Sequence, residues 1–297
     1  MIEPPPSARA VLPRGAALMV VAAVGFAVMN ACAKEASLRL PFIEIAFARS
    51  LVGAVALALY ARARGASLAI HNRRLMALRA GSGVAAMALT FYALSVSPLG
   101  EASALLNLTP LFVALLGAVF LGERPSPAIV VALCLGMAGA LLVFQPRPGA
   151  LSRGGVAAIC ASATAAVSMV SLRRLGDTES SEAVVTHFLA AGAVVTLVAT
   201  APVFVTPTAR ELSLLVVAGL SATVAQVTMT RAYAADVAAR VGGMNYLQIV
   251  AGLALGAAVF GERPGALAWA GIAAILAAGA ALVWSARRAP AQDGTSL

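Results

Sequence analysis

Ten long apolar stretches follow one another along this chain and constrain its fold more than any other feature. A bilayer core about 30 Å thick is crossed by about 20 helical residues, so each stretch predicts a transmembrane helix. None alternates apolar and polar residues as membrane β-strands do. The sequence therefore predicts an all-α integral membrane protein with spans at Gly15–Ala33, Phe42–Tyr60, Ala80–Pro98, Ala102–Gly122, Ser126–Gln145, Gly154–Leu172, Ala183–Pro202, Leu212–Thr230, Val241–Gly261 and Gly265–Ala286.

The composition excludes most other classes of protein. Only 11% of the 297 residues are charged and 61% are hydrophobic, whereas soluble domains carry about a quarter charged residues. Two histidines and three cysteines argue against a metal site and a disulfide scaffold, so we expect no cofactor. The net charge of +9 comes from arginines that flank apolar stretches, which is typical of contact with a lipid bilayer and not with nucleic acid.

The basic residues also predict an orientation. With the N-terminus in the cytoplasm, two-thirds of the 21 lysines and arginines fall on the cytoplasmic side. This bias predicts a multi-pass protein of the plasma (inner) membrane, with cytoplasmic tails at 1–13 and 289–297. The first stretch ends in Ala31-Cys32-Ala33, which also fits a signal-peptidase site, but the repeat described next requires this stretch as a helix.

A motif that occurs twice divides the chain into two halves. Gly-Glu-Arg-Pro is found at 122–125 and at 261–264, a spacing of 139 residues, and Arg-Gly pairs at 14–15 and 153–154 have the same spacing. We therefore predict one five-helix repeat over 14–147 and a second over 148–288. An odd number of helices inverts the second repeat in the membrane, an arrangement that recurs in secondary transporters.

The residues around the two motifs resemble a known family. The stretches 106–143 and 245–283, together with Arg49 and the segment 91–94 (Phe-Tyr-Ala-Leu), are similar to ten-helix EamA-type members of the drug/metabolite transporter superfamily. The resemblance covers nearly the whole chain. It implies that the protein is a transporter and not an enzyme. Such a transporter would export amino acids, other metabolites or drugs, and the aromatic amino-acid exporters are a candidate group.

The repeated motif predicts structural corners between helices. Gly122 and Gly261 each follow an apolar stretch, where glycine tolerates the left-handed conformation that ends a helix. Glu123 and Glu262 come next and are predicted to belong to the same tight connections. The alternative role for the two glutamates is that of a gate or a proton carrier.

Pro110 lies inside the fourth predicted span. A proline there removes a backbone hydrogen bond and frees the carbonyl of Leu106, which in a membrane needs a partner or a wet cavity. We expect a hinge or kink here beside a substrate cavity, and the alternative is a kink that serves packing alone. The equivalent residue of the second repeat is Ile249, so the two halves differ at this position.

Polar residues inside spans indicate where a solute binds, because they are costly in lipid. They concentrate in the first, third, fourth, sixth, eighth and ninth spans, which predicts a cavity among these helices. Each polar group has the alternative of a bond to a neighbouring helix. The candidate substrate-binding residues are Phe26, Asn30, Met87, Phe91, Tyr92, Asn107, Ser168, Gln226, Asn245, Tyr246 and Gln248.

The predicted cavity wall carries no formal charge, because acidic and basic residues lie near span ends. Such a wall favours a neutral or zwitterionic small-molecule substrate. With the resemblance, it predicts export of amino acids, including aromatic ones, and related metabolites by alternating access. The alternative is multidrug efflux of hydrophobic cations, and a membrane protease that uses Ser82 and His187 has no supporting spacing. Proton coupling and oligomeric state stay open, a monomer being compatible with the sequence.

Overall fold

The computed structural model describes residues 14–96, 99–146, 152–261 and 263–288. All regular structure within these ranges is helical, and nine stretches in them are long and apolar enough to cross a membrane. The chain is therefore an all-helical integral membrane protein, as the apolar stretches predicted. The predicted tails 1–13 and 289–297 lie outside the described residues.

The helices follow the predicted spans, with two of the spans divided in the middle. The short 3-10 helix η1 (Ala201–Val203) continues the helix before it. The α-helices are α1 (Arg14–Ala36), α2 (Phe42–Arg64), α3 (Arg73–Val96), α4 (Leu99–Leu106), α5 (Thr109–Leu121), α6 (Pro127–Phe144), α7 (Arg153–Leu175), α8 (Ser181–Thr200), α9 (Ala209–Ala235), α10 (Ala238–Met244), α11 (Leu247–Phe260) and α12 (Ala266–Arg288).

The third predicted span is not among the nine apolar stretches found in the described ranges. Its helix α3 starts at Arg73 and includes Arg79, and glycine, serine and threonine interrupt its apolar residues. With 24 residues at 1.5 Å per residue it is nevertheless long enough to cross a bilayer. It packs against α7 and α8, and this packing buries Arg79.

The spans predicted over 102–122 and 241–261 are present, but each is divided into two helices. The fourth span consists of α4 and α5, and the ninth consists of α10 and α11. The first break lies at Asn107 and Leu108, and the second at Asn245 and Tyr246. The breaks fall at nearly equivalent positions of the 139-residue repeat, which shows that both halves interrupt the same helix.

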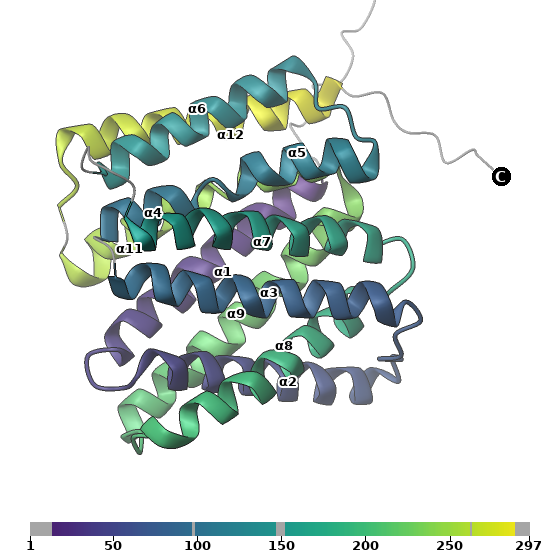
Figure 1. Ribbon diagram of the computed structural model, residues 1–297, viewed down its shortest axis with the longest axis vertical. Coiled ribbons are helices and arrows are strands. Elements are labelled where there is room, and N and C mark those ends of the chain that lie inside the picture. The colour runs from purple at the N-terminus through teal and green to yellow at the C-terminus, as the bar shows by residue number, and fades with distance from the viewer. Residues whose placement is uncertain (1–13, 97–98, 147–151, 262, 289–297) are drawn as a thin grey trace, which may run out of the picture.

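Helices of the two halves pair reciprocally. α1 packs along α9 and α3 along α7, so the first helix of each half lies against the third helix of the other. α2 packs along α8, and α6 along α12; Figure 1 shows these two pairs at opposite edges of the bundle. Small residues allow close contact of α6 with α12, since a Cβ added at Gly139 would lie 2.7 Å from the carbonyl oxygen of Gly271.

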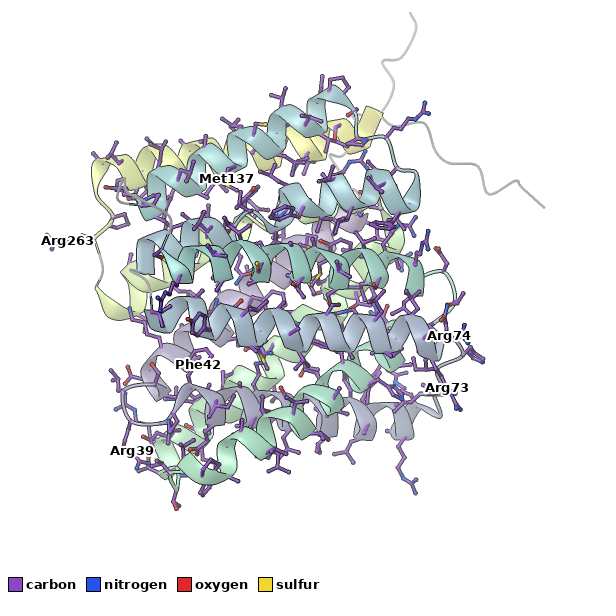
Figure 2. The ribbon with its side chains drawn as sticks, viewed as in Figure 1. Arg39, Phe42, Arg73, Arg74, Met137 and Arg263 are labelled. Carbon is purple, nitrogen blue, oxygen red and sulfur yellow. The ribbon has the colours of Figure 1, made fainter. Side chains whose placement is uncertain are left out.

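Arginines mark the two ends of the bundle. Figure 2 shows Arg39 and Arg263 at one end and Arg73 and Arg74 at the opposite end. We name these the Arg39 end and the Arg73 end. The helices run between them, so a membrane would separate the two ends.

Candidate functional site

The break between α4 and α5 leaves a carbonyl that a neighbouring helix satisfies. The carbonyl oxygen of Leu106 accepts hydrogen bonds from Ser162 Oγ of α7 and Thr109 Oγ1, both at 2.9 Å. The side-chain amide of Asn107 donates to the carbonyl of Ser103 at 2.8 Å. The carbonyl that Pro110 was predicted to free thus has hydroxyl partners, as a membrane interior requires.

The break between α10 and α11 forms without a proline. The chain tightens there into bonds three residues apart, from Asn245 N to the carbonyl of Gly242 at 3.0 Å and from Tyr246 N to that of Gly243 at 3.3 Å. Such short turns of 3-10 type often mark a hinge within a helix. The interruption is therefore a property of both halves and does not depend on Pro110.

The two breaks touch each other in the middle of the molecule. Tyr246 Oη donates to the carbonyl oxygen of Asn107 at 3.2 Å, and these residues are 139 positions apart. Tyr246 is buried, with 2% of its surface exposed. Because residues at equivalent positions of the two repeats are in direct contact here, the axis that relates the two halves passes close to this bond.

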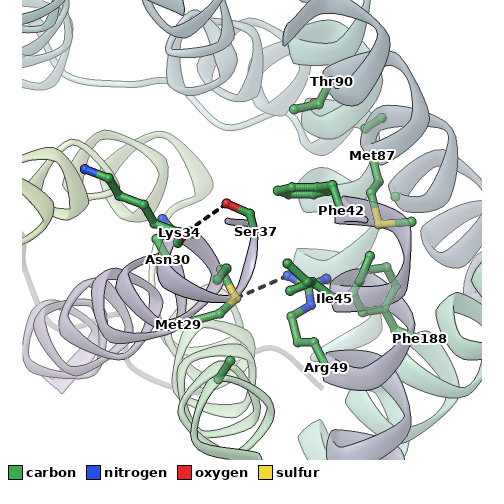
Figure 3. A pocket seen from close by; sticks show the side chains of 15 residues that line it. Met29, Asn30, Lys34, Ser37, Phe42, Ile45, Arg49, Met87, Thr90 and Phe188 are labelled. Atoms are coloured by element: carbon green, nitrogen blue, oxygen red, sulfur yellow. Dashed lines mark hydrogen bonds between the residues drawn. The ribbon is translucent and has the colours of Figure 1, made fainter. Parts of the chain in front are cut away.

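Two adjoining cavities lie beside the breaks. The first has a volume of about 570 Å³, and Figure 3 shows its wall of methionine, phenylalanine and polar side chains from α1, α2, α3 and α8. The second, of about 530 Å³, lies between α4 and α11, with Ser103 on one side and Gln248 on the other. Asn30 and Thr90 line both cavities, so the two spaces share a wall.

The first cavity reaches the Arg39 end of the bundle. Lys34, Ser37 and Phe42 lie near the loop between α1 and α2, line the cavity and are exposed. Its deeper wall is formed by Met29, Arg49, Gly83, Ala86, Met87, Phe188 and Ala218. A solute can therefore enter from the Arg39 end and meet a mostly apolar pocket.

Arg49 is a cation on the wall of the first cavity. Its Nη1 donates to Met29 Sδ at 3.3 Å (Figure 3), its Nε has no hydrogen-bond partner, and no ion pair to it occurs among the described residues. A charge taken out of water is costly unless it is paired. The prediction of a wall without formal charge is wrong, because α2 was not expected to line the cavity and because Lys34 lines it as well.

Comparison with known proteins decides the family. Residues 13–145 match the EamA-like transporter family. The pseudopaline exporter CntI of Pseudomonas aeruginosa is 34% identical over 273 residues, which cover 91% of this chain and 96% of that protein. The chain belongs to the EamA-like transporter family.

Other similar proteins of known name and structure agree with an EamA-like fold. Riboflavin transporters of Rhizobium johnstonii and Vibrio cholerae are 31% and 25% identical, over 62% and 89% of this chain and 62% and 90% of those proteins. A crystal structure that is 23% identical has a TM-score of 0.82 and covers 92% of this chain and 98% of that one. That likeness shows the fold alone.

The structure of this EamA-like transporter brings five of the predicted substrate-binding residues to the cavities. They are Asn30, Met87, Asn107, Asn245 and Gln248. The others lie elsewhere or cannot be placed. Phe26, Ser168, Gln226 and Tyr246 are buried outside both linings, Tyr92 is half exposed outside them, and the side chain of Phe91 is outside the described part.

Sequence reasoning missed the residues that α2 and α8 contribute, chiefly Arg49 and Phe188. A signal for Arg49 was present, because an arginine inside an apolar span of a membrane protein is by default a functional candidate. Its position seven residues after the start of α2 was interpreted as a span end instead. Phe188 has no signal in the sequence that separates it from packing phenylalanines.

At the Arg73 end, Glu123 of the first corner closes the gap between α5 and α10. Its Oε2 accepts the backbone N–H of Ala238, the first residue of α10, at 2.9 Å, and its Oε1 lies 3.5 Å from Arg173 Nε. Burial raises the pKa of the Glu123 carboxyl, although the N–H of Ala238 and the charge of Arg173 act against this. A carboxylate at a helix N-terminus also complements the helix dipole.

The glycines of both corners adopt the conformation that the motif suggested. Gly122 ends α5 with φ of 68° and Gly261 ends α11 with φ of 66°, which is the left-handed region that favours glycine. Glu262 lies outside the described residues. The role of the two glutamates beyond their position therefore stays a prediction.

Proposed function

We propose that this EamA-like transporter exports small solutes that carry a carboxylate, namely amino acids, including aromatic ones, and related metabolites, by alternating access. Arg49 is the observation that carries the proposal. A guanidinium on a cavity wall, with no acidic partner among the described residues, suits a carboxylate through paired charged hydrogen bonds. The bound solute would supply the negative charge that the described residues do not place beside Arg49.

The rest of the wall suits the body of such a solute. Met29, Met87, Phe42 and Phe188 offer thioether and aromatic surface close to Arg49. The second cavity offers amides, from Asn107, Asn245 and Gln248, that can bind an amino group or other polar groups. Each volume lies in the range of about 300–1,000 Å³ that is usual for small-molecule sites.

The proposed direction of transport is supported by the predicted orientation and by the name of a relative. We infer that the Arg73 end faces the cytoplasm, because it carries the arginine-rich loop. A protein that shares 34% of its residues is named an exporter, which supports outward transport. A membrane-impermeant thiol reagent added to cells is expected to label Ser37→Cys and to spare Asn72→Cys, in a chain whose native cysteines are replaced; the opposite pattern would invert the orientation.

Efflux of hydrophobic cations is less compatible with this cavity. Arg49 and Lys34 are both on its wall, and their positive charges repel a cationic solute. Riboflavin is a separate candidate, since two relatives are named for its transport. It lacks a carboxylate and would bind through the amides and aromatic rings, so it belongs in the test.

The test is transport by purified protein in proteoliposomes, with phenylalanine, phenylalanine amide, riboflavin and a lipophilic cation as solutes. We expect flux of phenylalanine and not of its amide. Arg49→Gln should lower kcat/KM for phenylalanine about 10- to 150-fold, the equivalent of one lost charged hydrogen bond, while Arg62→Gln at the exposed end of α2 should leave it unchanged. Flux of the lipophilic cation without flux of any amino acid would replace the proposal by drug efflux.

A further inference from the structure

We propose that Arg79, with Ser168 and Gln226, forms a second carboxylate site, closed in this conformation and equivalent by the repeat to the cavity around Arg49. This proposal rests on the proposed transport of carboxylate solutes. The second site would receive the solute when the Arg73 end is open. It would bind the same carboxylate group that Arg49 binds from the Arg39 end.

Arg79 is a buried cation that has no acidic partner among the described residues. Only 1% of it is exposed. Its Nη1 donates to Ser168 Oγ, and its guanidinium lies 4.1 Å from the ring centroid of Phe188. Its Nε has no hydrogen-bond partner among the residues that the structure describes. No ion pair to Arg79 occurs in the described part of the chain, so a hydroxyl and an aromatic face are what compensate for its burial.

Gln226 supplies a second polar atom that lacks a partner. Its Oε1 is buried and accepts no hydrogen bond in the described part of the chain, and only 8% of the residue is exposed. A buried polar group without a partner costs about 1–3 kcal/mol. Such groups are rare in proteins, and each calls for a reason, of which a ligand that is absent in this conformation is one.

The repeat relates these groups to the open cavity. A shift of 139 residues converts Met29, Arg49 and Ala218 of the open cavity into Ser168, Phe188 and Arg79. In the open set the guanidinium of Arg49 contacts Met29, and in the closed set the guanidinium of Arg79 contacts Ser168. One arginine therefore contacts each of the repeat-equivalent residues Met29 of α1 and Ser168 of α7. The arginine comes from α2 in the first case and from α3 in the second.

The same shift relates two more unpartnered groups to the open cavity. Met87 and Lys34 of the open cavity become Gln226 and Arg173. Among the described residues, six buried side-chain atoms lack a hydrogen-bond partner, and four of them belong to Arg49 in the open cavity or to Arg79, Arg173 and Gln226 in its counterpart. Arg173 Nε lies near Glu123 at an ion-pair distance but not in hydrogen-bonding geometry.

The two sites are separated by very little protein. Gly83 and Phe188 line the open cavity, and a Cβ added at Gly83 would lie 2.9 Å from Arg79 Nη1 and 2.7 Å from the Phe188 ring. Arg79 thus lies directly behind the cavity wall. A carboxylate that left Arg49 would meet Arg79 after a displacement of Phe188, so the solute would remain paired with a cation throughout the exchange.

The experiment compares binding with transport for matched arginine variants. Arg79→Gln is tested beside Arg74→Gln, which alters an exposed arginine on the same helix. Phenylalanine binding to the detergent-solubilised protein reports on the open Arg49 cavity, and phenylalanine exchange in proteoliposomes reports on the full cycle. We expect Arg79→Gln to bind phenylalanine within about threefold of wild type and to lose about 10- to 150-fold in exchange rate.

Two further variants keep the test decisive if Arg79→Gln does not fold. Arg79→Lys preserves the charge and should restore part of the exchange, and Gln226→Leu should lower exchange while binding is retained. Exchange by Arg79→Gln and Gln226→Leu equal to that of Arg74→Gln overturns the second site alone. Equal loss of binding and exchange in folded Arg79→Gln also overturns it, because Arg79 would then only support the Arg49 cavity. Absence of amino-acid flux in wild type instead refutes the proposed function, and this site with it.

Discussion

The two interrupted spans, α4–α5 and α10–α11, lie opposite each other at both ends of the bundle. A cavity separates them at one end, and they are in contact at the other. Toward the Arg39 end, Ser103 of α4 and Gly252 of α11 line the second cavity, and a Cβ added at Gly252 would meet no atom of the described residues within 4 Å. Toward the Arg73 end, the equivalent residues are Gly242 of α10 and Val113 of α5. A Cβ added at Gly242 would lie 3.2 Å from Val113 Cγ1, so this half is packed.

Equivalent residues of the two halves are therefore held in different arrangements. In an inverted repeat, exchange of the two arrangements turns a molecule open at one end into a molecule open at the other. The bond between Tyr246 and Asn107 joins the two breaks and lies in neither half alone. The contacts of α5 with α10 would therefore have to separate as α4 approaches α11.

The largest effect is expected from locking the closed half. The Cβ atoms of Ala238 and of a residue introduced at Gly117 would be 3.7 Å apart, close to the mean of about 3.8 Å in disulfides. In a chain without its native cysteines, oxidation of Gly117→Cys/Ala238→Cys should abolish solute flux in proteoliposomes, and a reductant should restore it. Full flux in the oxidised protein would show that this half does not open, and each single cysteine variant is the control.

Removal of the Glu123 bond is expected to have the next largest effect. Glu123→Ala leaves the buried N–H of Ala238 without an acceptor, which should favour opening at the Arg73 end by about 1–3 kcal/mol, or about 5- to 150-fold. The rate at which a thiol reagent labels Ala239→Cys from that end measures the opening. Glu123→Gln keeps an acceptor, so Ala239→Cys should be labelled slowly in this variant. It should also be labelled slowly in Glu182→Gln, which breaks a different ion pair at the same end.

A smaller effect is expected from pH, and its sign follows from Glu123. Burial raises the pKa of this carboxyl above its ordinary value of 4.5 while the Arg73 end is closed, and opening would return it to water. The closed form therefore binds the proton more tightly. A fall in pH through the raised pKa toward 4.5 stabilises the closed form, and a rise in pH favours opening.

Charged neighbours on three helices set this pH response. Arg173 of α7 favours the ionised carboxyl, while Asp236 after α9 opposes it and is itself paired with Arg240 of α10. Labelling of Ala239→Cys, corrected for the ionisation of a free thiol, should slow as the pH falls in wild type and lose this slope in Glu123→Gln. A slope that persists in Glu123→Gln would assign the response to another group.

The smallest effect is expected at Pro110. The second half breaks its helix with Ile249 at the equivalent position, and the carbonyl of Leu106 already has two hydroxyl partners. Pro110→Ala should therefore change the free energy of unfolding by less than about 1 kcal/mol and transport by less than about twofold. Thermal unfolding and phenylalanine flux check this, and loss of flux in a stable variant would make the proline an essential hinge.

Hydropathy and the repeated motif were sufficient to predict the helical membrane fold. The positions of the breaks were predictable only in part, because Pro110 signals the first, whereas Asn245 and Tyr246 form the second with no helix-breaking proline. The weak apolar character of α3 also follows from packing, since Arg79 is buried by α7 and α8 and not by its own helix. Local sequence does not report which neighbour compensates for a polar residue.

The candidate site was less accessible from sequence for a related reason. The positions of polar residues in the sequence indicate groups that face the interior, and Asn30 and Gln248 from that set line a cavity. These positions cannot tell which half is open, so Ser168 and Gln226 were grouped with them although they lie in the closed half. Whether Arg49 lies on a cavity wall or near the end of its span depends on how α2 packs, and its position in the sequence does not show this.

Spin-label distances at both ends test whether the two halves exchange arrangements. Val96 and Arg263 at the Arg39 end are equivalent to Ala235 and Arg124 at the Arg73 end, and all four are exposed. On addition of phenylalanine to labelled proteoliposomes, we expect part of the molecules to show a shorter distance for Val96–Arg263 and a longer one for Arg124–Ala235. Distances that stay fixed, or change in the same direction, while phenylalanine is transported would contradict the account.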